Sequence, residues 1–205
     1  DLHWSNSGTW GKHLQQKNMP NEGSAEFWRD VAVRYKDDPA VMFDLYNEPR
    51  DVSWDVWRHG GMVENEKLDD GTFTTYRTPG MQGLVNAIRD TGARNIIIAG
   101  GLDWAYDLSG VLAGYALEDR EGGFGVMYAS HIYPWKSDWE GKVGRVAKLH
   151  PVLIGEVGCE PDPEQENPYT WGPDMLGYIQ REKLHWAAWC FHPSASPRML
   201  LDWDY

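Results

Sequence analysis

From residue 24 onward, short apolar runs alternate with segments in which apolar residues recur at helical spacing. The apolar runs predict five strands, at residues 41–46, 95–99, 126–130, 152–155 and 184–190. The segments between them predict helices at residues 24–36, 79–91, 139–149 and 173–183. Strands that alternate with helices are typical of βα units, and short strands with few charges suit a parallel sheet covered by helices.

The first two predicted helices have recognisable ends. Ser24 can cap the first helix and Asp38-Pro39 stops it, whereas Gly92 ends the second helix. The residues expected to face inward are Phe27, Val31 and Tyr35 in the first helix and Met81, Leu84, Val85 and Ile88 in the second. Glycine and proline clusters at 60–61, 122–123 and 161–168 predict loops, and regular elements resume after each. We therefore expect residues 1–205 to form a single domain.

The charge balance narrows the classes of partner. With 19 basic and 31 acidic residues the net charge is −12, which repels the phosphates of nucleic acid and the surface of anionic membranes. No apolar run is long enough to span a bilayer. A neutral polysaccharide or oligosaccharide feels no such repulsion, so we expect a sugar substrate to be compatible with this charge, and nucleic acid and membrane partners to be absent.

Polar side chains follow the predicted strands where each strand ends. Asn47-Glu48-Pro49 follows the 41–46 run, His131-Ile132-Tyr133 follows the 126–130 run, Glu156 follows the 152–155 run, and Trp189 lies at the end of the last run. Parallel sheets place their working residues just beyond the carboxyl ends of the strands. These side chains are therefore expected to share one face of the sheet.

Two of these residues, Glu48 and Glu156, are carboxylates placed directly after apolar runs, where burial is costly without a partner or a task. Either one alone could form an ordinary ion pair at a strand end. Two carboxylates on separate strands of one sheet can instead face each other across a cleft, which is the arrangement that glycoside hydrolysis needs. One then protonates the leaving oxygen while the other attacks the anomeric carbon.

Tryptophan is unusually frequent near the predicted strand ends. Nine of the twelve tryptophans fall at these ends or in the loops beyond them: Trp4, Trp10, Trp54, Trp57, Trp104, Trp135, Trp171, Trp189 and Trp203. An indole has a flat apolar face with a polar edge, which matches a pyranose ring. About half of these tryptophans are expected to anchor loops instead, and Trp189 is expected to bind sugar.

Other site chemistries find no support in the sequence. It lacks a phosphate-binding glycine motif, a His-Glu-x-x-His motif and a Gly-x-Ser-x-Gly motif, and its seven histidines show no paired metal-ligand spacing. We therefore expect neither a metal nor a cofactor in catalysis. Cys159 and Cys190 are expected to be buried thiols, with a single disulfide between neighbouring strands as the alternative.

Taken in order, five motifs resemble glycoside hydrolase family 5, the cellulase family: Asp1-Leu2-His3, Asn47-Glu48-Pro49, His131-Ile132-Tyr133, Ile154-Gly155-Glu156 and Trp189. The resemblance implies an α/β fold of the (β/α)8 TIM-barrel type and net retention at the anomeric carbon. It assigns Glu48 as acid/base and Glu156 as nucleophile. It also implies that Asn47 contacts the 2-hydroxyl, Tyr133 contacts the nucleophile, and Trp189 binds the sugar before the scissile bond. His3 and His131 belong to the catalytic neighbourhood.

The resemblance begins at the tip of the family's third strand, so the chain is expected to be an N-terminally truncated, incomplete barrel that carries strands four to eight. A characteristic arginine on the second strand is not matched. The expected activity is hydrolysis of β-1,4-glucan, by a monomer that is secreted. The alternatives are another β-glycanase acting on mannan, xyloglucan or β-1,3-glucan, and a non-catalytic sugar-binding fragment.

Overall fold

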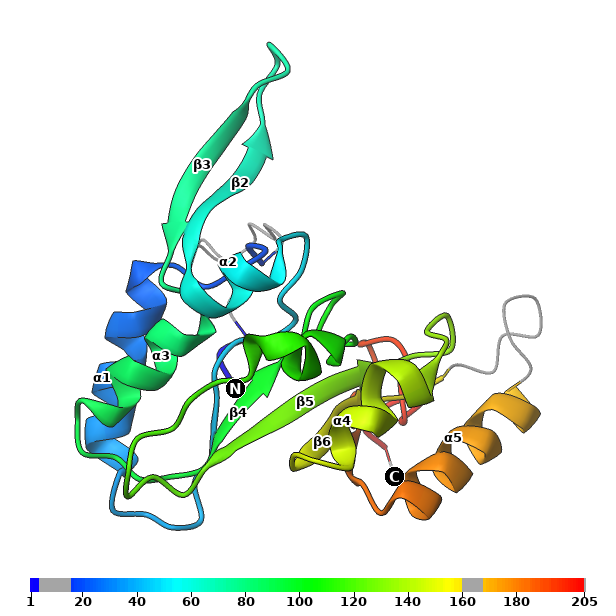
Figure 1. Ribbon diagram of the computed structural model, residues 1–205. Coiled ribbons are helices and arrows are strands. Elements are labelled where there is room, and N and C mark those ends of the chain that lie inside the picture. The colour runs from blue at the N-terminus through cyan, green and yellow to red at the C-terminus, as the bar shows by residue number, and fades with distance from the viewer. Residues whose placement is uncertain (4–15, 160–167, 205) are drawn as a thin grey trace.

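The computed structural model describes residues 1–3, 16–159 and 168–204, and its main feature is a curled sheet of five parallel strands (Figure 1). In spatial order the strands are β1 (Phe43–Asp44), β4 (Ile97–Gly100), β5 (Val126–Ile132), β6 (Val152–Val157) and β7 (His185–Ala188). Each strand falls on one of the five predicted apolar runs. The sheet forms part of a (β/α)8 barrel, which confirms the predicted fold class.

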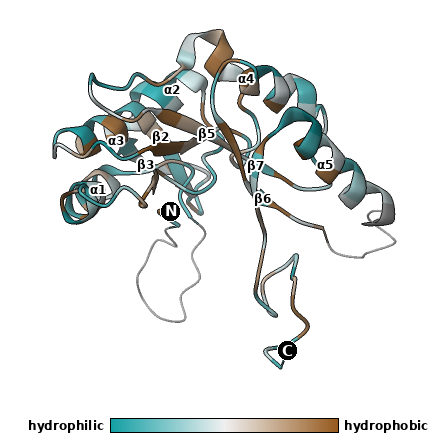
Figure 2. Cartoon of the chain, turned by 90° about the horizontal axis from the view of Figure 1, so that it is seen from below, coloured by the Kyte–Doolittle hydropathy of each residue, from teal (hydrophilic) through white to brown (hydrophobic). Residues whose placement is uncertain are grey.

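Helices cover one side of this sheet, at the four places where helical periodicity predicts them. They are α1 (Glu22–Tyr35), α3 (Gly80–Arg89), the π-helical turn η2 (Glu140–Gly144) that continues into α4 (Arg145–Ala147), and α5 (Pro168–Glu182). Figure 2 shows hydrophobic residues along β5 and β6, with the helices arranged around them. None of the helices in the described ranges has the length and apolar content needed to cross a lipid bilayer.

Helix α1 corrects two details of the sequence-based prediction. Its N-cap is Asn21, and Ser24 is the third residue of the helix, where it completes a capping box with Asn21. The buried face carries Ala25, Trp28 and Ala32, whereas Phe27 and Tyr35 are exposed. Small alanines let the helix approach its neighbours closely, and the Trp28 indole reaches in to donate a hydrogen bond to the Leu45 carbonyl, 2.8 Å away. Of the predicted face, Val31 alone packs against the core, partly buried, so the face of Ala25, Trp28 and Ala32 decides the orientation of α1.

Helix α3 follows the prediction, since all four of its predicted inward residues are buried. The chain between β1 and α3 differs from the prediction because it contains α2 (Trp54–His59) and an antiparallel hairpin of β2 (Gly61–Lys67) and β3 (Phe73–Thr78). The hairpin projects away from the main sheet (Figure 1). Its alternation is almost wholly polar, which is why apolar periodicity does not find it. A further π-helical turn, η1 (Val111–Tyr115), was also not predicted.

The first three residues lie beside β1. The Leu2 amide donates to the Asp44 carbonyl and the Asn47 amide donates to the Leu2 carbonyl, both over 3.1 Å. This extended segment occupies the place where the sequence predicts the tip of another strand. It brings His3 level with the carboxyl end of β1. At the opposite edge of the sheet, Cys159 and Cys190 are not joined by a disulfide.

Candidate active site

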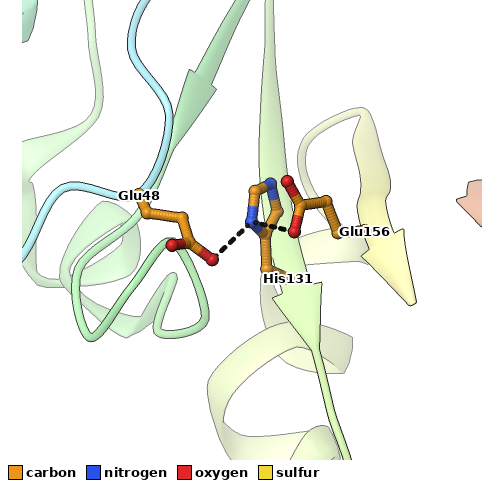
Figure 3. Close-up of side chains that lie close together, drawn as sticks. All are labelled: Glu48, His131 and Glu156. Atoms are coloured by element: carbon orange, nitrogen blue, oxygen red, sulfur yellow. Dashed lines mark hydrogen bonds and ion pairs between the residues drawn. The ribbon is translucent and has the colours of Figure 1, made fainter. Parts of the chain in front are cut away.

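Glu48, His131 and Glu156 come from three separate strands or strand ends and meet at the carboxyl edge of the sheet (Figure 3). The Nδ1 atom of His131 lies 3.1 Å from Glu48 Oε1 and 3.4 Å from Glu156 Oε2. One oxygen from each glutamate and this nitrogen all lie within 4.8 Å of one another. His131 is buried, Glu156 is at the edge of burial, and the Glu48 side chain is 21% exposed. The two carboxylates therefore face a common space that solvent reaches from the Glu48 side.

A bulge in β6 brings Glu156 beside His131. Ser130 is paired with Ile154, but the next residue, His131, is paired with Glu156, so Gly155 is the extra residue in β6. A β-carbon on Gly155 would lie only 3.1 Å from Nε2 of His131. Glycine at this position lets the imidazole lie against the β6 backbone. Without the bulge, the residue after Ile154 would be paired with His131, and Glu156 would alternate to the other face.

The loop that carries Glu48 is held in an unusual conformation. Glu48 has a φ of +52°, a left-handed value that is costly for a residue with a β-carbon and that is often found at functional sites. The buried Arg50 guanidinium donates to the Glu48 carbonyl over 3.2 Å and stacks 3.9 Å from the Trp104 ring. The Trp104 amide in turn donates to the Pro49 carbonyl. These contacts tie the loop after β1 to the loop after β4 and fix the Glu48 backbone.

Tyr133 contacts the second glutamate. Its hydroxyl donates a 2.7 Å hydrogen bond to Oε2 of Glu156. Burial, together with the negative charge of Glu156, raises the pKa of the Tyr133 phenol above its ordinary range. The phenol therefore stays protonated at any pH near neutrality and remains a donor to Glu156.

A second group of predicted residues consists of Asn47, His3 and Trp189, which contact one another in that order. Nδ2 of the buried Asn47 lies 3.0 Å from Nε2 of His3, and the His3 ring stacks on Trp189 with centroids 6.0 Å apart. The Trp189 indole N–H donates to the Ser196 carbonyl over 3.2 Å, which fixes the plane of the ring. The structure therefore brings all seven predicted site residues to one end of the sheet, in two adjoining groups.

A cavity of about 230 Å³ opens beside Glu48. The described residues that line it are Glu48, Trp104, Tyr133, Trp135 and Lys136. It is walled mainly by aromatic rings, with a carboxylate and an ammonium group at its edge. Such a lining suits a neutral ligand that has both flat apolar faces and hydroxyl groups.

Some of the nine tryptophans that were expected at strand ends or in loops lie in helices instead. Trp54 and Trp57 lie in α2 and Trp171 lies in α5, so these three are in helices rather than loops. Trp57 is fully buried and its indole donates to the Gly100 carbonyl, which makes it a structural anchor. Trp104, Trp135, Trp189 and Trp203 lie in loops as predicted. Trp4 and Trp10 lie outside the described residues.

Three residues near the site were not assigned a role from the sequence: Arg50, Lys136 and Asp44. Arg50 directly follows the Asn-Glu-Pro motif, and Lys136 lies three residues after the His-x-Tyr motif. Neither was singled out, because a basic residue in a loop is usually solvated. Asp44 did leave a signal. It is a charged residue inside the apolar run 41–46, and the cost of burial that singled out Glu156 applies equally to it.

The Glu48, His131 and Glu156 atoms are also close enough to bind a metal ion. Spacing along the sequence does not reveal this set, because its members lie on different strands. Carboxylate and imidazole ligands suit several divalent metals. The acid–base chemistry of two carboxylates requires no metal, so none enters the function proposed below.

Asp44 lies on β1 among the charges of the site. Burial, with a smaller contribution from the charge of Glu156, raises the pKa of the Asp44 carboxyl to about 6, although His131, the amino group of Asp1 and His3 act in the opposite direction. Its ordinary value is 3.8. The folded protein therefore retains a proton on Asp44 at pH values where the unfolded chain has lost it.

This difference predicts that stability falls as pH rises from about 4 to about 6, because the unfolded state binds fewer protons in that range. The contribution of Asp44 is at most about 3 kcal/mol. The free energy of unfolding, measured with urea, should differ less between pH 4 and pH 7 for Asp44→Asn than for the wild type. Asp174→Asn, at an exposed position on α5, is the matched control and should unfold as the wild type does. Equal pH dependence in wild type and Asp44→Asn would contradict the expectation.

The arrangement of a partial (β/α)8 barrel with two facing glutamates at its carboxyl end defines a class of carbohydrate-active barrels. The model of the family described as Cellulase (glycosyl hydrolase family 5) matches residues 1–195. The chain belongs to this family, as the sequence resemblance indicated.

Individual relatives agree with this family. The chain is 25% identical over 192 residues to a cellulase of a Thermoanaerobacterium species, covering 86% of this chain and 46% of the relative. It is 24% identical over 238 residues to an endoglucanase of Paenibacillus polymyxa, covering 99% of this chain and 56% of the relative. The chain thus spans about half the length of these curated relatives.

Among solved structures, the chain is similar to a β-glucanase from Saccharophagus degradans, with a TM-score of 0.68 and 25% identity. The match covers 94% of this chain and 57% of the β-glucanase chain. The same β-glucanase has been solved in complex with cellotetraose, with the same TM-score and coverage. These matches agree with the barrel assignment made from the sheet.

Proposed function

We propose that this chain carries the catalytic centre of a retaining, endo-acting β-1,4-glucanase, with Glu156 as nucleophile and Glu48 as acid/base. One observation carries the proposal: an oxygen of Glu48 and an oxygen of Glu156 lie within 4.8 Å of each other. Retaining glycosidases hold their two carboxyl groups about 5–5.5 Å apart, whereas inverting enzymes need about 6.5–9.5 Å to admit a water molecule. The observed spacing favours the retaining reaction.

In the first step, a Glu156 oxygen would attack the anomeric carbon as the bond from that carbon to the leaving oxygen breaks. The Glu48 carboxyl would transfer its proton to the leaving oxygen, and a glycosyl ester of Glu156 would form. In the second step, the Glu48 carboxylate would take a proton from water as the water oxygen attacks the same carbon. The ester bond then breaks, and Glu156 is released as a carboxylate.

The neighbouring side chains support these roles. The Tyr133 hydroxyl donates to Glu156 and would hold the nucleophile's attacking oxygen in place. His131 lies between the two carboxylates, so that an N–H at Nδ1 can donate to either one as its charge changes. Asn47, which contacts His3, would contact the sugar 2-hydroxyl, and the stacked pair of His3 and Trp189 would hold the sugar bound before the scissile bond.

The substrate is the less direct part of the proposal. Its support comes from relatives described as cellulase and endoglucanase and from a structural neighbour solved with cellotetraose. We also propose that the monomer is the acting unit. We further propose that the protein is secreted, because a β-1,4-glucan polymer is too large to enter a cell.

The full-length protein should release new reducing ends from carboxymethyl cellulose faster than from mannan, xyloglucan or β-1,3-glucan. Nuclear magnetic resonance of the products from a cello-oligosaccharide should show the β-anomer first, because two displacements restore the original configuration. Initial appearance of the α-anomer would contradict a retaining reaction. Binding of cello-oligosaccharides without any new reducing ends would favour the alternative of a non-catalytic sugar-binding protein.

A further inference from the structure

Trp135 is an exposed indole with a fixed position. Its side chain is 69% exposed, although large aromatic rings are usually buried. The Lys136 amide donates to the Tyr133 carbonyl over 2.8 Å and closes a turn with Pro134 at its second position. The Lys136 ammonium then pairs with Asp103 over 2.9 Å, which ties the turn to the loop after β4.

One face of the Trp135 ring stacks on Tyr133. The ring centroids are 5.1 Å apart and the planes differ by only 8°. This contact, together with the proline turn, keeps the indole from folding back onto the protein surface. Because the ring is 69% exposed, much of its surface remains open to solvent. A rigid aromatic ring presented in this way can stack on a pyranose at a small cost in conformational entropy.

The position of Trp135 relative to the two glutamates indicates which part of a substrate it would meet. Trp135 lines the 230 Å³ cavity, and of the two glutamates only Glu48 lines that cavity with it. The acid/base must lie beside the leaving oxygen, so the space next to Glu48 is where the departing sugar would lie. The Trp189 and His3 pair lies with Asn47 in the other group.

We propose that Trp135 is the stacking platform for the sugar on the leaving-group side, and that through Tyr133 it couples occupancy of that side to the position of the nucleophile. The coupling follows the chain of contacts from the Trp135 ring to the Tyr133 ring and from the Tyr133 hydroxyl to Glu156 Oε2. The inference rests on the proposed function, since it takes Glu48 as acid/base and Glu156 as nucleophile. A leaving sugar stacked on Trp135 stabilises the reactive arrangement, so its binding energy appears in the rate of the first step.

The experiment compares Trp135→Ala and Trp135→Phe on two substrates in the full-length protein. Cellopentaose places sugars on the leaving-group side, whereas β-cellobiosyl fluoride places none there. For Trp135→Ala we expect kcat/KM for cellopentaose to fall about 10- to 100-fold, with part of the fall in kcat. The kcat/KM for β-cellobiosyl fluoride should change less than about threefold. Trp135→Phe should restore most of the lost activity. The matched control is Phe124→Ala. Phe124 is an exposed aromatic residue just before β5, at the opposite end of the sheet, and its substitution should leave kcat/KM for both substrates unchanged.

Two results would overturn the inference: an unchanged kcat/KM for cellopentaose in Trp135→Ala, or equal losses on both substrates, which would mean that Trp135 only supports the fold around Tyr133. Failure of the proposed function gives a different result, because the wild type would then turn over neither substrate. In that event, calorimetry with cellopentaose still tests the platform. Weaker binding by Trp135→Ala than by the wild type supports the platform, and equal binding overturns it.

Discussion

Replacing Glu156 by alanine is expected to lower turnover of every glycoside substrate by about ten-thousand-fold or more, because it removes the proposed nucleophile, which would form the covalent intermediate. Because alanine is smaller than glutamate, the substitution leaves a small space where the Glu156 carboxylate lay. Added azide should occupy this space, attack the anomeric carbon in its place, and restore part of the activity on substrates with good leaving groups. A single displacement by azide gives an α-glycosyl azide, which mass spectrometry and nuclear magnetic resonance can identify.

The control for this variant is Glu118→Ala. Glu118 is an exposed carboxylate that is paired with Arg58 and, within the described part of the chain, forms no ion pair with any of the seven predicted site residues, so its removal should leave activity intact. Thermal unfolding of Glu156→Ala should resemble that of the wild type, so that lost activity is not lost folding. Turnover near the wild-type rate in Glu156→Ala would remove its assignment as nucleophile.

Replacing Glu48 by glutamine is expected to separate substrates by their leaving groups. Glutamine keeps the shape of the side chain but has no proton to donate, so cleavage of polysaccharide should fall about 100- to 10,000-fold. In a dinitrophenyl cellobioside the leaving group is dinitrophenolate, which departs without protonation, so the first step with that substrate should stay close to the wild-type rate. The second step lacks its base, and the glycosyl ester of Glu156 should accumulate. A burst of dinitrophenolate followed by slow turnover is the measurement.

Azide distinguishes this variant from the Glu156 variant. It needs no base, so in Glu48→Gln it should attack the glycosyl ester and yield a β-glycosyl azide through two displacements. The opposite configurations of the azide products in the two variants test the two roles independently. In Glu48→Gln, equal losses in the rate of the first step on polysaccharide and on the dinitrophenyl glycoside would contradict the role of Glu48 as acid.

The parallel sheet could be predicted because its inner strands, β4, β5 and β6, are largely buried, although the edge strand β7 is exposed. Runs such as Val152-Leu153-Ile154 contain no charge, and burial of this kind leaves a continuous apolar signature. The β2 and β3 hairpin was missed for the converse reason. Most of its residues are polar or exposed, and its stability depends on contacts such as the Tyr76 hydroxyl with the Met19 backbone, 57 positions away in sequence. No local pattern records a contact of that kind.

The orientation of α1 illustrates a second limit. Two helical stripes run along the segment, one through Phe27, Val31 and Tyr35 and the other through Ala25, Trp28 and Ala32. The prediction chose the first stripe because all three of its side chains are large and apolar, whereas two of the three in the second stripe are alanine. The tertiary structure buries the second, because alanine permits close packing and Trp28 finds the Leu45 carbonyl.

The sequence by itself determined which side chains reach the active face, because residues that follow parallel strands meet at one edge whatever the details of packing. It could not determine distances. The spacing of Glu48 and Glu156 depends on the Gly155 bulge, on the left-handed Glu48 backbone and on the Arg50 and Trp104 contacts that hold it. Those features arise between segments remote in sequence, so only the tertiary structure decided that Trp135 stacks on Tyr133 and that Asp44 lies among the site's charges.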